Sequence, residues 1–169
     1  GYVMQNPNQM LVKDMIKDEI ALTLTLNNFE QSVIDERVEK VLKMTGLYPM
    51  RNWPVSVLSY GQKKRITIAS ILVLEPEVII LDEPTAGQDL KHYTEIMSFI
   101  DELNRKSDIA IVFITHDMHL AIEYTDRAIV FADGECIADD TVYRVLSNDE
   151  VIEKASLKKT SIVTVAQKC

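Results

Sequence analysis

The feature that most constrains the fold is a short apolar run, VIIL at residues 78–81, bounded by Pro76 and Pro84. A short, continuous and mostly β-branched run is typical of a strand buried on both faces of a parallel sheet, because neither face meets water. Residues 109–114 form a second run of this kind. The sequence therefore predicts two such strands, connected by a helix over residues 91–105.

The segment before these strands has the apolar spacing of helices. Residues 10–26 and 29–44 both follow this period, and Gly46 suits a helix end. Ser59 is a plausible N-cap for a long helix that continues to residue 74. Helices followed by strand, helix and strand favour an α/β core preceded by a helical subdomain.

The rest of the chain extends this pattern. A helix is expected over residues 118–125, then a strand over 128–132 and a hairpin turn at Asp133-Gly134 into 135–138. The remaining residues are expected to be helical and mostly polar. The predicted division is 1–9 (end of a truncated core), 10–74 (helical subdomain), 75–140 (α/β core) and 141–169 (C-terminal tail).

Composition excludes several classes of protein. The net charge is −8 and the pI about 4.9, which argues against a nucleic-acid carrier that neutralises phosphates. The basic cluster KKR at 63–65 is accordingly predicted to be a solvated helix face. The longest apolar run is too short to cross a bilayer. Cys136 and Cys169 form no CxxC, which excludes a disulfide scaffold or zinc ribbon and fits a reducing cytosol.

Chemistry is expected where the two buried strands end. Asp82 and Glu83 directly follow the first strand, and ligands of open α/β sheets bind at the carboxyl ends of strands. Asp82 would face a magnesium ion and Glu83 a water molecule. A solvated acidic loop is the alternative. It weakens because His116 ends the second strand and would reach the same edge.

A second candidate site is the start of the long helix, LSYGQ at residues 58–62, called here the signature segment. Ser59 offers a hydroxyl, and Gly61 permits close approach of a ligand to the backbone. The free N–H groups and the partial positive charge of a helix N-terminus favour an anion. Taken alone, however, an ordinary Ser cap is the better interpretation.

Together these features resemble ABC-transporter ATPases. The signature segment resembles the family's LSGGQ motif, VIILDEPT at 78–85 its Walker B strand, and AGQD at 86–89 its D-loop. Gln5 resembles the Q-loop glutamine and His116 the switch histidine. Five motifs in family order make the match specific. The variants QNP, LSYGQ and AGQD are most similar to the second cassette of the two-cassette energy-coupling factor ATPases, which take up cobalt and vitamins.

The resemblance implies a P-loop NTPase (RecA-like) parallel-sheet core, incomplete here, with an ABC helical subdomain. It implies an ATPase that binds ATP and Mg²⁺. By this carry-over, Glu83 polarises the attacking water and His116 contacts the γ-phosphate. Asp82 supports the magnesium ion, and Gln5 reaches the metal and water. These residues would position the reactants and stabilise the charge on the transferred phosphoryl group, which are the two requirements of phosphoryl transfer.

The resemblance also implies partners. Ser59, Gly61 and Gln62 would clasp the γ-phosphate of ATP held by a second cassette, identical or not, and Asp89 would couple the two sites. Transmembrane subunits would hold the protein at the cytoplasmic face of the membrane for import of a small solute such as a metal ion or vitamin. No nucleic-acid partner is implied.

One family motif is missing from these residues. Walker A needs Gly, four residues, then Gly-Lys and Ser or Thr, and no glycine here precedes a lysine. We therefore expect a fragment that, alone, neither binds ATP well nor hydrolyses it. Two other readings are open: a catalytically silent cassette that lends its signature to a partner's site, and a soluble ABC protein of translation or DNA repair. The latter is disfavoured because no sustained heptads occur.

Overall fold

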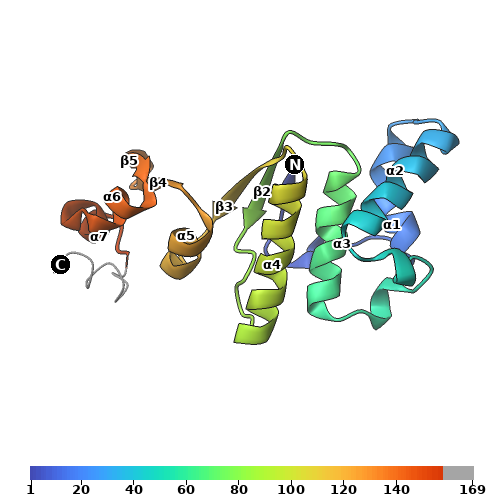
Figure 1. Cartoon of the computed structure of the whole chain (residues 1–169), viewed down its shortest axis with the longest axis horizontal. Coiled ribbons are helices and arrows are strands. Elements are labelled where there is room, and N and C mark those ends of the chain that lie inside the picture. Colours follow the sequence, from blue (N-terminus) through green and yellow to red (C-terminus); the bar gives the residue numbers. More distant parts are fainter. Residues whose placement is uncertain (158–169) are drawn as a thin grey trace. The chain divides into compact units, whose positions relative to one another are not determined.

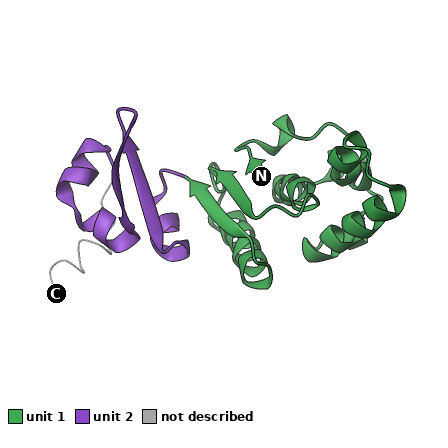
Figure 2. Cartoon of the chain, turned by 90° about the horizontal axis from the view of Figure 1, so that it is seen from above, with its two compact units in different colours: residues 1–114 green, residues 115–169 purple. Residues whose placement is uncertain are grey.

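The computed structural model describes residues 1–157, and the chain divides into two compact units, Gly1–Ile114 and Thr115–Cys169 (Figure 2). The last part of the predicted tail, including Lys158, Lys159 and Cys169, lies outside the described residues.

The first unit contains a three-stranded parallel sheet (Figure 1). Its strands are β1 (Tyr2–Val3), β2 (Val78–Asp82) and β3 (Ala110–Ile114), in the order β1-β2-β3. This arrangement confirms the α/β class and the two predicted parallel strands.

The prediction that β2 and β3 are buried on both faces is wrong for this structure. Ile79 and Leu81 are buried, but Val78, Val112 and Ile114 are 42%, 45% and 50% exposed. Within this unit the helices cover only one face of the sheet, along which α4 (Leu90–Lys106) runs (Figure 2). Side chains on the other face therefore lack the covering layer that a doubly wound sheet supplies.

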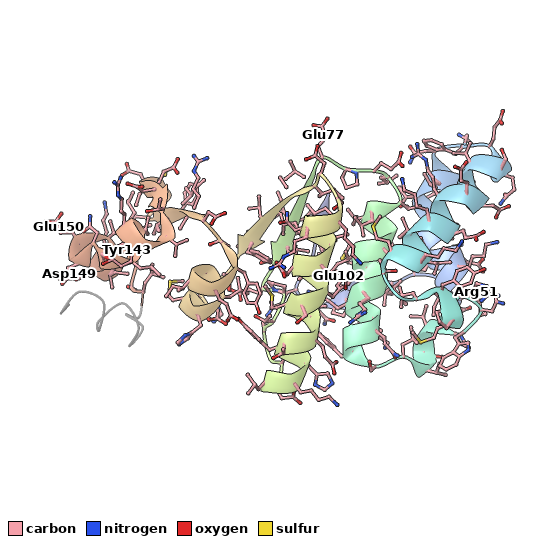
Figure 3. All side chains as sticks on the ribbon, viewed as in Figure 1. Arg51, Glu77, Glu102, Tyr143, Asp149 and Glu150 are labelled. Atoms are coloured by element: carbon pink, nitrogen blue, oxygen red, sulfur yellow. The ribbon has the colours of Figure 1, made fainter. Side chains whose placement is uncertain are left out.

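Three further helices complete the first unit, as predicted: α1 (Ile16–Leu26), α2 (Gln31–Met44) and α3 (Tyr60–Leu72). Helix α3 lies centrally, in contact with β1, α1, α2 and α4 (Figure 1). Short 3-10 turns occur at η1 (Pro7–Gln9), η2 (Tyr48–Met50) and η3 (Val55–Val57). Charged side chains such as Glu77 and Glu102 project outward (Figure 3).

Helix α1 begins six residues later than the sequence predicts, at Ile16 instead of Met10. The backbone before it is bound elsewhere: the Glu19 carboxylate accepts hydrogen bonds from the amides of Val12 (2.8 Å) and Lys13 (2.6 Å). These side-chain bonds compete with helical ones, so the segment remains non-helical.

The second unit is a hairpin covered by short helices. Its elements are α5 (Met118–Tyr124), β4 (Arg127–Ala132), β5 (Glu135–Thr141), α6 (Val142–Ser147) and α7 (Asp149–Lys154). The hairpin is antiparallel, and positive φ at both Asp133 (51°) and Gly134 (80°) fits the predicted tight turn.

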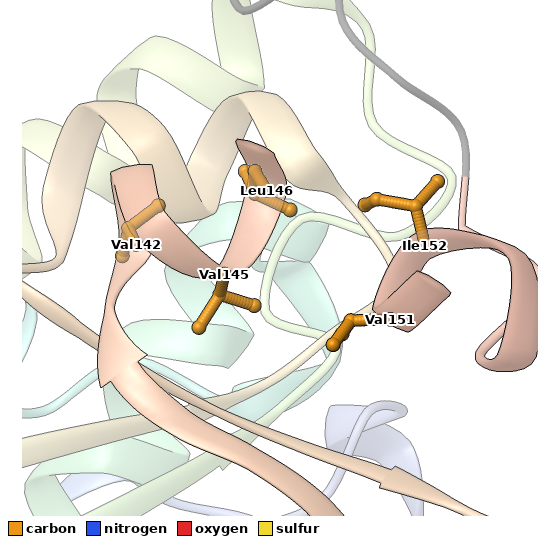
Figure 4. Packing of buried hydrophobic residues seen from close by; sticks show 5 residues of the cluster. All are labelled: Val142, Val145, Leu146, Val151 and Ile152. Atoms are coloured by element: carbon orange, nitrogen blue, oxygen red, sulfur yellow. The ribbon is translucent and has the colours of Figure 1, made fainter. Parts of the chain in front are cut away.

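The core of the second unit comes from the region predicted to be a mostly polar tail. Five buried side chains of α6 and α7 form it (Figure 4): Val142, Val145, Leu146, Val151 and Ile152. Polar residues such as Glu150 remain on the surface (Figure 3). The few apolar residues of this segment therefore form the hydrophobic core of the unit.

None of the helices among residues 1–157 is both long enough and apolar enough to cross a membrane.

Candidate functional site

The carboxyl edge of the three-stranded sheet brings two predicted segments together. The register pairs Val3 of β1 with Leu81 of β2. Gln5 and Glu83, each two residues further on, therefore leave neighbouring parallel strands at the same edge. This is the edge at which open α/β sheets bind ligands.

Asp82 is half-buried at this edge and faces a phenol and an ammonium group. The Tyr2 hydroxyl donates to Asp82 Oδ2 at 2.6 Å. This hydrogen bond is the main cause that raises the pKa of Tyr2. Burial lowers the pKa of Lys64 to about 8, and the negative charge of Asp82 partly opposes that shift.

Glu83 adopts an unusual backbone conformation where β2 ends. Its φ is +41°, in the left-handed region that non-glycine residues rarely occupy. Its amide donates to the carbonyl of Ile114 at 2.8 Å, and its carbonyl accepts from Ala86 at 3.2 Å. These bonds hold the strained residue in place, and such strain gathers at functional sites.

The signature segment forms a complete capping box at the start of α3. Ser59 Oγ accepts from the Gln62 amide (3.3 Å), and Gln62 Oε1 accepts from the Ser59 amide (2.9 Å). The predicted N-cap is confirmed. The Ser59 hydroxyl accepts this bond, so its own hydrogen can still be donated to a ligand.

A cavity of about 240 Å³ lies beside the signature segment, lined by Ser59, Gly61 and Gln62 and by His92 and Glu95 of α4. His92 also contacts the predicted D-loop residue Asp89. Asp89 Oδ1 accepts from the backbone amide of His92 and lies 2.9 Å from its ring Nδ1. These contacts lower the pKa of Asp89, which is the N-cap of α4.

His116 lies in the second unit, directly before Asp117, whose carboxylate caps α5. Its side chain is exposed. Since His116 belongs to a different unit from Asp82 and Glu83, its predicted approach to them stays a prediction.

Lys64 is a residue of this region that the sequence interpretation missed, since the cluster 63–65 was expected to be solvated. That expectation is wrong for Lys64, which is 1% exposed. Its Nζ donates to the carbonyls of Met4 (2.9 Å) and Gln5 (2.8 Å). The signal was available, because Lys64 lies four residues before buried Ile68 on the same stripe of α3.

Comparison with known proteins agrees with these observations. The family model described as ABC transporter matches residues 1–86. The chain belongs to the ABC transporter family. This cassette is 34% identical to a solved structure, cbiO1 from Clostridium perfringens, described as part of the ABC transporter complex cbiONQ. The TM-score is 0.79, and the match covers 99% of this chain and 66% of that one. The predicted fold class and the resemblance to energy-coupling factor ATPases are thereby confirmed.

Two curated relatives carry the name of an ABC transporter ATP-binding protein. The protein from Enterococcus faecalis is 61% identical over 167 residues, and the one from Clostridium perfringens is 61% identical over 168. Each match covers 99% of this cassette but 29% of the relative. The chain therefore spans less than a third of the length of these relatives.

Proposed function

We propose that this cassette forms part of an ATP-hydrolysing site that powers import of a small solute. The observation that carries the proposal is the gathering of Gln5, Asp82 and Glu83 at one carboxyl edge of a parallel sheet. Membership of the ABC transporter family supports it.

The oxygen donors at this edge fit Mg²⁺. Asp82 would hold the ion together with the Gln5 amide oxygen. Magnesium favours one or two carboxylates while it keeps several waters, so it needs no dense cage of ligands. Among residues 1–157, no group of three or more His, Cys, Asp or Glu side chains is placed so that it could hold a metal ion. When bound, the ion neutralises charge on the nucleotide phosphates.

Glu83 would act as the base, and His116 would bind phosphate. The carboxylate of Glu83 would orient and polarise a water molecule, and a positioned base of this kind contributes about 10²–10⁴-fold in rate. His116 would contact the terminal phosphate. The fixed backbone of Glu83 supports its proposed role as the base, because a side chain that is already in position needs no rearrangement during the reaction.

The signature segment would serve a second cassette. Ser59, Gly61 and Gln62 would approach the γ-phosphate of its nucleotide, and Asp89 would couple the two sites. The cavity beside these residues supports this role, since it extends from the α3 N-terminus to the helix that Asp89 caps.

A membrane partner is part of the proposal. The solved relative is described as part of a transporter complex, and we place this cassette likewise on transmembrane subunits at the cytoplasmic face of the membrane. A metal ion or a vitamin would be the imported solute. Because no Walker A pattern occurs in these residues, the chain alone would neither bind ATP well nor hydrolyse it.

A chimera tests the proposal: this chain replaces the matching 167 residues of the Enterococcus faecalis relative. We expect Mg²⁺-dependent ATP hydrolysis, and Asp82→Asn should raise the Mg²⁺ concentration needed for half-maximal turnover about ten-fold or more. Asp139→Asn, in the second unit, is the control. An unchanged Mg²⁺ requirement in Asp82→Asn would remove Asp82 from the site. If only signature variants reduce turnover, the cassette is a silent one that serves its partner.

A further inference from the structure

Two side chains at the start of α3 converge on the backbone of Gln5. The Tyr60 hydroxyl donates to the Gln5 carbonyl at 3.1 Å, and Lys64 Nζ donates to the same oxygen at 2.8 Å. Tyr60 and Lys64 lie four residues apart, so they share one face of the helix. Gln5 is 55 residues or more from both in sequence, and no strand pairing fixes it.

Because Lys64 is buried, its ammonium group depends on hydrogen bonds to nearby backbone carbonyls. With 1% of its surface exposed, the ammonium group has lost almost all contact with water. Buried charges are costly unless hydrogen bonds replace their hydration. The carbonyls of Met4 and Gln5 accept hydrogen bonds from this ammonium group, so the Gln5 backbone and the Lys64 side chain stabilise each other.

Tyr60 occupies the position where the resembling motif has its first glycine. A glycine there could not reach Gln5, whereas the tyrosine ring spans the distance and ends on the Gln5 carbonyl. Its hydroxyl is partly desolvated, which raises the pKa of Tyr60, and a tyrosine hydroxyl is already protonated and able to donate at neutral pH.

We propose that Tyr60 and Lys64 are positioning residues that fix the Gln5 backbone onto the first turns of α3. The consequence of this contact rests on the proposed function. The signature segment would serve the nucleotide of a second cassette, whereas Gln5 would serve the nucleotide site of its own cassette. The contact therefore links the two sites mechanically within one cassette. Displacing the start of α3 would then displace Gln5, without any direct contact of Tyr60 or Lys64 with nucleotide.

Hydrogen exchange in the chain itself tests the link without nucleotide. The amides of Asn8, Gln9 and Met10 bond within the η1 turn that follows Gln5, so their protection reports how firmly this segment is held. Lys64→Met should speed their exchange about ten-fold or more, because a charged hydrogen bond is lost. Lys64→Arg, which keeps the charge, should restore most of the protection.

Tyr60→Phe is the milder variant and decides the question if Lys64→Met does not fold. It should speed exchange of the same amides about three-fold while α1 and β2 stay protected. Tyr143→Phe and Lys40→Met are matched controls at exposed sites. Unchanged exchange at residues 8–10 in folded Lys64→Met, or in Tyr60→Phe, would overturn the proposal.

Turnover of the chimera separates positioning from mere stability. Tyr60→Phe should lower kcat with little change in KM, since Gln5 would be misplaced while nucleotide binding persists. A change in KM alone would contradict a positioning role. If the chimera shows no hydrolysis that depends on Glu83, the proposed function fails while the exchange result still judges the link.

Discussion

Tyr2 donates its hydroxyl hydrogen to Asp82 Oδ2 at 2.6 Å, which joins the strand before Gln5 to the strand before Glu83. The bond crosses between β1 and β2 at the edge where both strands end. It links two segments that are 80 residues apart in sequence. The candidate site is thus held by side-chain contacts as well as by the strand register.

Asp82→Asn should lower the pKa of Tyr2. The hydrogen bond to the carboxylate is the largest cause of the raised value, so a neutral acceptor weakens it. A raised tyrosine pKa stabilises the fold below the unfolded value of 10.0, and this contribution disappears as the pH rises through the folded pKa. Titration of ¹³C-labelled tyrosine by NMR measures the shift. A Tyr2 midpoint that does not move would contradict the assignment.

Lys64 should make stability rise with pH. Its folded pKa is about 8 and its ordinary value 10.5, so between these values the unfolded chain binds more protons. Below pH 8 Lys64 is charged in the folded chain, and the full free-energy cost of burying that charge lowers stability. As the pH rises above 8 the folded chain loses this proton and the cost falls. The gain in stability is at most about 1.4 kcal/mol per unit of pKa shift.

The measurement for Lys64 is urea unfolding at pH 7 and pH 9.5, in the original chain and in Lys64→Met. The difference in unfolding free energy between the two proteins should change with pH, because all other titrating groups are shared. Parallel pH profiles would show that Lys64 has an ordinary pKa.

Ser59→Ala should destabilise the chain by about 0.5–2 kcal/mol, since it removes the acceptor of the α3 capping box. Ser56→Ala is the matched control, at an exposed position three residues earlier. Urea unfolding of both variants measures the difference. Equal stability would mean that the capping box contributes nothing.

Leu146→Ala should cost about 2–5 kcal/mol because it opens a cavity in the core of the second unit. Leu26→Ala, at a site that is 71% exposed, should change stability far less. Hydrogen exchange of β4 and β5 would locate the effect. If protection there is unchanged, the cluster on α6 and α7 does not hold the hairpin.

The sequence predicts the motif-bearing elements well because their signals are local. Pro76 and Pro84 delimit β2, Ser59 marks the start of α3, and Asp133-Gly134 marks the hairpin. Contacts between distant segments are harder to predict. The carboxylate of Glu19 keeps residues 12 and 13 out of α1, and no helical period reveals that.

The candidate site shows the same division. Asp82 and Glu83 could be placed at a sheet edge because parallel strands have their carboxyl ends at the same edge of the sheet. The burial of Lys64 could not be inferred from charge, although its place on the apolar stripe of α3 indicated it. The approach of His116 to Glu83 remains a prediction, since the two residues belong to different units.

Turnover of the Glu83→Gln chimera tests the central claim most directly. The amide keeps the shape of the side chain but cannot accept a proton, so we predict a loss of about 100-fold or more in kcat with ATP binding retained. Glu135→Gln, an exposed residue of the hairpin, should leave turnover unchanged. Undiminished hydrolysis in Glu83→Gln would contradict the account.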